Sequence, residues 1–235
     1  MPIKNKKCPV RKCPWGAQLN NELSFLIACC QIDPSEDDIE FIHSILNDQQ
    51  LDTKALLGLA TQHGILPLIY KTLKKLCIDV QEHFLKNLKS SYTQIAQRNM
   101  LMSAELIRIM KLLEKNDIEA LAFKGPVLSQ MAYGDITLRQ SVDLDILVDE
   151  DDAFRAGKLM SENGHTSILP LNILSNKTCL HTAKDFSLMS KTGGVHTELH
   201  WRLFEKKYNI SILSCAVDKK CQTVKINNKE IRTLQ

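Results

Sequence analysis

Residues 118–148, IEALAFKGPVLSQMAYGDITLRQSVDLDILV, decide the fold that the sequence predicts. A short apolar run at 121–123 is interrupted by Lys124-Gly125-Pro126, and apolar residues then recur at helical spacing until Gly134. A polar loop leads from there into the apolar run at 143–148. This order predicts a strand, a helix, a loop and a second strand.

The predicted strand at 143–148 carries two carboxylates among apolar residues. Side chains alternate across a strand, so Asp143 and Asp145 share one face while Leu144 and Ile146 occupy the other. Two adjacent carboxylates repel each other and lose hydration, so we expect a bound cation to neutralise them.

The composition is that of a globular protein that can bury a substantial core, with 44% hydrophobic and 24% charged residues in 235. No apolar run approaches the roughly 20 residues that span a bilayer, so we expect no membrane partner. The basic start lacks the apolar stretch of a signal peptide. Eight cysteines without a secretion signal then favour reduced thiols and a cytoplasmic location.

The formal charge of +3 is unevenly distributed along the chain. Five Lys and Arg residues and no acid fall within the first twelve positions, which leaves −2 for the remainder. The sequence predicts a basic flexible arm at residues 1–18, with attraction to nucleic acid or to a membrane surface as the weaker alternative.

Residues 19–115 have apolar side chains at three- and four-residue steps, which predicts a helical N-terminal region. Residues 116–235 mix helical and strand periods, so the predicted class is α+β, with helices followed by a mixed sheet that is flanked by helices. Beyond Val148 we expect an acidic helix start and a helix up to Gly164. The remaining expected elements are a strand at 165–169, an irregular insert at 170–182, a hairpin of 184–189 with 195–201, and short strands at 223–226 and 231–233.

The second arm of the expected hairpin places His196, Glu198 and His200 on one face. If this arm lies beside the strand at 143–148, Glu198 joins the two aspartates there in a cluster of three carboxylates. Such a cluster suits Mg²⁺ or Mn²⁺, and two such ions about 3.5–4 Å apart could clamp an attacking oxygen and a leaving phosphate. A zinc or iron site built on His196, Glu198 and His200 is the alternative.

Several motifs occur together in order: Lys124-Gly125, Tyr133-Gly134-Asp135, Leu138-Arg139, Ser141, residues 143–148 and residues 198–203. This combination resembles the polymerase-β-type nucleotidyltransferase superfamily, and most closely its bacterial branch of nucleotidyltransferase family proteins. The helical lead-in, including residues 60–70, is similar to that of the same branch, so the resemblance covers roughly residues 20–235. The usual Gly-Gly or Gly-Ser of the superfamily is Lys124-Gly125 here, as in this branch.

The resemblance implies a role for each carboxylate. Asp143, Asp145 and Glu198 would be catalytic and would hold Mg²⁺ or Mn²⁺. Glu198 could also take a proton from the acceptor hydroxyl. The resemblance further implies that His200 supports Glu198, although a buried structural histidine is a close alternative.

The resemblance also implies a substrate-binding set of Lys124, Gly125, Arg139 and Ser141 beside His200. Gly125 would let backbone N–H groups approach the nucleotide phosphates, and Lys124 and Arg139 would contact phosphate. For Arg139, a structural ion pair with Asp135 or with a carboxylate of the site is an equally weighted alternative.

By this resemblance the chain is a metal-dependent nucleotidyltransferase that moves NMP from an NTP such as ATP to a hydroxyl or phosphate, releasing pyrophosphate. The acceptor stays open between RNA, a protein and a small molecule. The alternatives are a catalytically degenerate binding or regulatory protein with a protein partner, and a zinc or iron hydrolase. Members of the branch continue beyond the strand that corresponds to residues 231–234, so the catalytic core at 116–235 is expected to lack a C-terminal helical domain.

Overall fold

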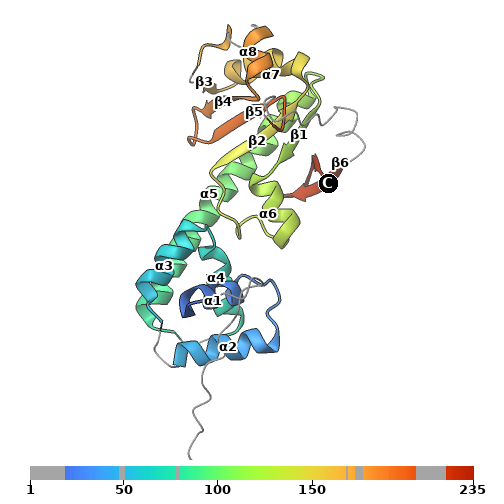
Figure 1. The fold of residues 1–235 in the computed structure, drawn as a ribbon. Helices are drawn as coiled ribbons and strands as arrows, with labels where there is room; N and C mark the ends of the chain where they lie inside the picture. The colour runs from blue at the N-terminus through green and yellow to red at the C-terminus, as the bar shows by residue number, and fades with distance from the viewer. Residues whose placement is uncertain (1–18, 48–50, 78–79, 168, 173–176, 205–220) are drawn as a thin grey trace, which may run out of the picture. The chain divides into compact units, whose positions relative to one another are not determined.

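The computed structural model describes residues 19–47, 51–77, 80–167, 169–172, 177–204 and 221–235 (Figure 1). The predicted arm at 1–18 lies outside these residues. The chain divides into two compact units, Met1–Ile95 with Leu138–Gln140, and Ala96–Thr137 with Ser141–Gln235. The sequence analysis instead divides the chain near residue 115, at the end of a helix whose residues fall in both units. The assignment of domains stays a prediction.

The first unit is built from helices where the periodicity predicts them. These are α1 (Asn21–Cys29), α2 (Glu36–Asn47), α3 (Thr53–Gln62), α4 (Leu66–Lys75) and the first part of α5 (Glu82–Glu114). Asn20 and Asp52 cap α1 and α3 by accepting hydrogen bonds from backbone N–H groups of the first turn. The apolar faces meet in one core that includes Phe25, Ile42 and Ile69. In the described part of the chain, no helix is long and apolar enough to cross a membrane.

The second unit is a mixed sheet with helices, which confirms the predicted α+β class. Its strands are β1 (Ala120–Phe123), β2 (Asp143–Val148), β3 (His165–Ser167), β4 (Asp185–Ser190) and β5 (His196–His200), in the order β1-β2-β5-β4-β3. Only the β2–β5 pair is parallel. Helix α6 (Gly125–Tyr133) follows β1, while the short helix η1 (Glu150–Asp152) and α7 (Ala153–Glu162) follow β2.

Two parts of the second unit lie outside this sheet. Strands β6 (Cys221–Ile226) and β7 (Lys229–Leu234) form a separate antiparallel pair, which contacts α6 and β1 (Figure 1). The predicted irregular insert at 170–182 is corrected, because the structure has a helix, α8 (Lys177–Thr182), at its end. This helix has only 6 residues, too few to show a repeating apolar period.

The five-stranded sheet buries one face and leaves the other for polar side chains. The buried face includes Leu144, Ile146, Leu188 and Leu199, and it packs in one core with apolar residues of α5 and α7. On β4, buried and half-buried residues alternate, as expected for a sheet with one covered face, and β5 follows the same alternation up to His200, which is also buried. Because α5 and α7 contribute to the covered face, the carboxylates of β2 and β5 project from the opposite one.

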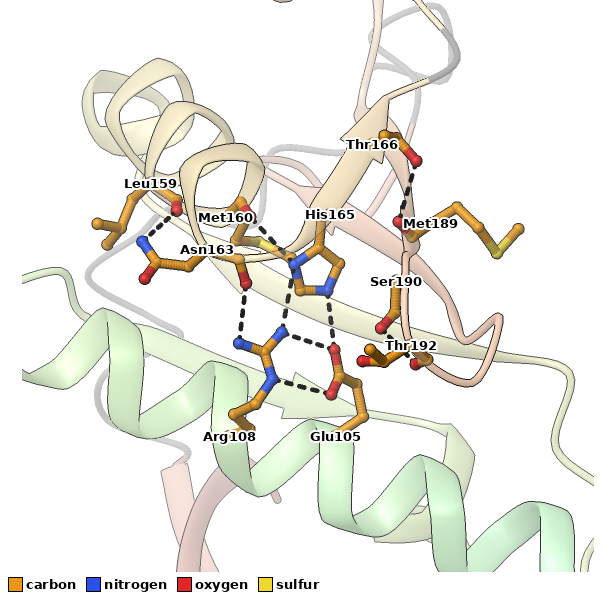
Figure 2. A network of polar contacts seen from close by, with 10 residues as sticks. All are labelled: Glu105, Arg108, Leu159, Met160, Asn163, His165, Thr166, Met189, Ser190 and Thr192. Carbon is orange, nitrogen blue, oxygen red and sulfur yellow. Dashed lines mark hydrogen bonds and ion pairs between the residues drawn. The ribbon is translucent and has the colours of Figure 1, made fainter.

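A polar network ties α5 to α7 and β3, with Glu105 and His165 buried and Arg108 and Asn163 exposed (Figure 2). The Arg108 guanidinium donates to both carboxylate oxygens of Glu105, at 2.7 and 2.9 Å, and to the Asn163 carbonyl at 3.0 Å. His165 Nε2 lies 3.1 Å from Glu105 Oε1, and His165 Nδ1 lies 3.2 Å from the Met160 carbonyl. Burial dominates the shift of His165 and lowers its pKa. Burial opposes ionisation of Glu105, but hydrogen bonds and charge from Arg108, with His165, leave its pKa lowered.

The β4–β5 hairpin turns at the Gly193-Gly194 pair, as the sequence predicts. The Arg98 guanidinium of α5 donates to the Gly193 carbonyl at 3.1 Å and to the Gly194 carbonyl at 2.9 Å. Gly193 has φ +86°, and a Cβ placed there would lie 3.1 Å from Leu101 Cδ2. Glycine is therefore favoured by the backbone conformation, while a side chain there would also have to displace the exposed Leu101 side chain slightly. The two hydrogen bonds from Arg98 tie the turn that precedes β5 to α5.

Candidate active site

Strands β2 and β5 bring the predicted carboxylates together. In their parallel register, Asp143 pairs with His196 and Asp145 pairs with Glu198. Paired residues of neighbouring strands project to the same face, so three carboxylates and an imidazole meet there. The sequence analysis leaves the pairing of these two strands as a condition, and the register meets that condition although 47 residues separate the end of β2 from the start of β5.

Asp145 is the most enclosed of the three carboxylates, with 1% of its surface exposed. Its Oδ1 accepts a hydrogen bond from Lys124 Nζ at 2.7 Å and lies 3.1 Å from His200 Nε2. Burial would raise the pKa of Asp145, but its contacts with His200 and Lys124 outweigh burial and lower it. The second oxygen, Oδ2, is buried and has no hydrogen-bond partner among the described residues. Asp145 is therefore an anion with one oxygen still available to a ligand.

His200 lies between two of the carboxylates, and its role in supporting Glu198 stays a prediction. Its Nε2 is 3.2 Å from Glu198 Oε2 and 3.1 Å from Asp145 Oδ1. The imidazole is 2% exposed and meets the Phe123 ring edge-on, with 5.1 Å between ring centroids. These contacts leave the ring little freedom, so it holds the two carboxylates at a fixed spacing.

Strand β4 adds Asp185 to the surroundings of His200, which the sequence analysis does not single out. Asp185 pairs with His200 in the β4–β5 register, and its Oδ2 lies 3.7 Å from His200 Nδ1. Asp185 also pairs with Lys184, whose pKa is raised because that ion pair and the nearby acids outweigh burial. Counting back from a four-residue loop at 191–194 would have found Asp185 opposite His200.

The start of α6 holds Lys124 and Gly125 against β2 in an unusual backbone conformation. Lys124 has φ +54° and ψ −144°, a region that residues with a side chain rarely adopt. Gly125 has φ +41°, and a Cβ there would lie 3.2 Å from the Asp143 carbonyl oxygen. The glycine thus allows the helix start to approach β2 closely, and the strained position before it directs the Lys124 side chain to Asp145.

Ser141 and Arg139 are the two remaining residues of the predicted substrate-binding set. Ser141 is buried, and its hydroxyl has no hydrogen-bond partner within the described part of the chain. Arg139 is half-buried and lies in the segment Leu138–Gln140, which is grouped with the first unit. Contact of either side chain with a substrate stays a prediction.

Among the residues that the structure describes, two groups of side chains have the chemistry and spacing to hold a divalent cation. The inner group is Asp145, Glu198 and His200, and the outer group is Asp143, His196 and Glu198; within each group the ligand atoms lie within 4.8 Å of one another. Hard carboxylate oxygens, including the unpartnered Oδ2 of Asp145, fit Mg²⁺ or Mn²⁺. The alternative site with both histidines on one ion does not form among the described residues, because four residues of a strand separate them by about 13 Å.

One protein family, described as uncharacterised nucleotidyltransferase, matches residues 49–235 of this chain. None of the curated proteins matches it. Among solved structures, the chain is similar to a proposed nucleotidyltransferase from Thermotoga maritima, with 16% sequence identity and a TM-score of 0.38. That similarity covers 56% of this chain and 76% of the other.

Proposed function

The chain belongs to this family of uncharacterised nucleotidyltransferases, and from that premise we propose that it transfers NMP from an NTP to a hydroxyl or phosphate acceptor, with release of pyrophosphate. The observation that carries the proposal is the meeting of Asp143, Asp145 and Glu198 on one face of the β2–β5 pair. Three acids at this spacing are unfavourable without a counterion, so the site is suited to a divalent cation, Mg²⁺ or Mn²⁺.

Each residue has a role that its surroundings support. Bound by the three carboxylates, the cation would supply charge neutralisation at the phosphates of the NTP. Glu198, half-buried beside His200, would accept the proton of the acceptor hydroxyl. His200 would position Glu198 and Asp145 relative to each other.

The start of α6 would bind the triphosphate. The backbone N–H groups in its first turn have no partner within the helix, which favours an anion there. The Lys124 side chain is 53% exposed, so its ammonium can contact a phosphate from the same position that reaches Asp145. Arg139 and Ser141 complete the proposed binding set. The acceptor class stays open between RNA, a protein and a small molecule.

A second candidate is a protein of the same fold that binds a nucleotide or a protein partner without catalysis. The observation that favours it is the ion pair of Asp145 with Lys124, because the protein itself then neutralises part of the carboxylate charge. Transfer of label from an NTP separates the two candidates, since a binding protein would retain the NTP unchanged.

The test is incubation of the purified protein with each α-labelled NTP, Mg²⁺ or Mn²⁺, and a cell extract. The inactive control is Asp143→Ala/Asp145→Ala, and the matched control is Glu36→Ala/Asp37→Ala, which removes two exposed acids of α2. We expect label to enter a product with wild type and the matched control, and not with the inactive variant. Sensitivity of that product to nuclease or protease then assigns the acceptor class. Absence of transfer, together with absence of cation-dependent NTP binding, would refute the proposal.

A further inference from the structure

Glu198 is shared by the inner and outer groups, and the two groups differ in burial. Asp145 and His200 of the inner group are buried, whereas all three members of the outer group are half-exposed. The sheet therefore presents two adjacent positions, each with two carboxylates and one imidazole. The outer position is the one that solvent and a ligand can reach.

The two positions also differ in how far the protein neutralises them. In the inner group, Asp145 Oδ1 already contacts Lys124 at 2.7 Å and His200 at 3.1 Å. In the outer group, neither Asp143 nor His196 has a hydrogen bond or ion pair within the described residues. Asp143 thus has no ionic partner in the described part of the chain, whereas Glu198 contacts His200 and lies near Lys184. The buried Oδ2 of Asp145 adds a further unpartnered oxygen, on the residue that pairs with Glu198 across the two strands.

His196 adds a nitrogen ligand to the outer position, which carboxylates alone would not provide. It lies directly across from Asp143 in the β2–β5 register, and its ring nitrogen lies within 4.8 Å of carboxylate oxygens of Asp143 and Glu198. Mg²⁺ strongly prefers oxygen ligands, whereas imidazole nitrogen binds well to first-row transition ions. A set of two carboxylates and one imidazole therefore favours the transition ions over Mg²⁺.

We propose that the outer group Asp143, His196 and Glu198 binds a first-row transition cation in preference to Mg²⁺, with His196 as its nitrogen ligand. The proposal rests on the proposed function in one respect, the binding of a cation by Asp143 and Glu198. The contribution of His196 to the choice of cation is independent of whether NMP transfer occurs.

The test uses Mn²⁺ as the probe, because its free and bound forms are distinguished by electron paramagnetic resonance. Binding of Mn²⁺, and competition by Mg²⁺, would be measured for the full chain as wild type, His196→Ala, His196→Asp and Asp143→Asn. His43→Ala, which removes an exposed histidine of α2, is the matched control. Pulsed measurements at substoichiometric Mn²⁺ would report directly on a coordinated nitrogen through its coupling to the electron spin.

We expect wild type and His43→Ala to bind Mn²⁺ with a nitrogen coupling that disappears in His196→Ala. In that variant the Mn²⁺ affinity should fall by at least about tenfold, with Mg²⁺ affinity nearly unchanged. His196→Asp should lower the ratio of Mn²⁺ to Mg²⁺ affinity, because it replaces the nitrogen by oxygen.

Four outcomes would count against the assignment. Equal loss of both affinities in His196→Ala, or a nitrogen coupling that survives it, would overturn the role of His196 and leave the proposed function standing. Binding of neither cation by wild type, or binding unaffected by Asp143→Asn, would overturn the carboxylate site and the proposed function with it.

Discussion

Asp143 and Asp145 lie two residues apart on the same face of β2, yet their surroundings differ. Asp145 is buried and contacts Lys124 and His200, whereas Asp143 is half-exposed and has no such partner among the described residues. The sequence predicted both as equivalent metal ligands, since strand alternation alone gives the face and not the burial. The difference appears only once the neighbouring strands and the start of α6 are in place.

Because of this difference, we expect replacement of either aspartate to lower activity, and replacement of Asp145 alone to lower stability appreciably. Asp143→Asn and Asp145→Asn should each lower the rate of NMP transfer by about 10²–10³-fold, because both remove charge at the reacting phosphates. In a metal-free buffer, Asp145→Asn should also lower the free energy of unfolding by about 1–3 kcal/mol, since Lys124 and His200 lose an ionic partner. Asp143→Asn should change it by less than about 0.5 kcal/mol. Urea unfolding measures both, and equal losses would contradict the assigned surroundings.

The backbone of Lys124 leads to a second prediction. Its φ of +54° suits glycine, so Lys124→Gly should be more stable than Lys124→Ala by about 1 kcal/mol, although both variants lose the contact with Asp145. Comparing the two variants cancels the ion pair and isolates the backbone strain. Chemical denaturation of both proteins checks it, and an alanine variant as stable as the glycine variant would show that the position is unstrained.

At the level of elements, the sequence predicts the helices and most strands because each has a local period. The pairing of β5 with β2 enters the sequence analysis only as a condition for the carboxylate cluster, because local periodicity does not say which strands are neighbours. The sequence does not predict the contacts that depend on register, such as Lys124 with Asp145 or Asp185 with His200. The short helix α8 is missed for a related reason, since its position depends on packing: the Leu180 carbonyl accepts a hydrogen bond from Trp201 Nε1.

The β4–β5 turn provides a prediction at the same scale. Gly193→Ala should lower the free energy of unfolding by about 2–3 kcal/mol, because it combines a left-handed φ of +86° with a Cβ that would meet Leu101 at 3.1 Å. Gly194→Ala, at φ +57° with open space around it, should cost only about 1 kcal/mol. Urea unfolding of the two variants separates conformation from packing. A Gly194 variant that loses as much as the Gly193 variant would mean that α5 does not restrain the turn.

At the scale of the whole chain, α5 is the element that both units share, and its second half carries Glu105 and Arg108 of the polar network. The network holds an acid and a histidine whose pKa values are both lowered in the folded state. Each group therefore binds fewer protons in the folded chain than in the unfolded one as the pH falls. The stability of the second unit should accordingly decrease on acidification, first through His165 and then through Glu105.

The pH window follows from these directions. Above the ordinary pKa of 6.5, the contribution of His165 to the free energy of unfolding is fully present. This contribution is lost progressively as the pH falls from about 6.5 to the lower pKa that His165 has in the folded state. For Glu105, the loss begins only near its ordinary pKa of 4.5. Between about pH 6.5 and 5.5, the slope contributed by His165 can reach at most about 1.4 kcal/mol per pH unit, the value for one proton.

His165→Gln should remove this slope and leave the loss at lower pH in place, because glutamine does not titrate and can still donate to Glu105. Unfolding by urea at a series of pH values, followed by the fluorescence of Trp201, would measure it. Trp201 is buried in the second unit, and a Trp15→Phe background leaves it as the single tryptophan. His83→Gln, on the exposed surface of α5, is the matched control and should keep the wild-type slope. If His165→Gln also kept it, the protons would be taken up elsewhere, and the histidines of β5 would be the next residues to replace.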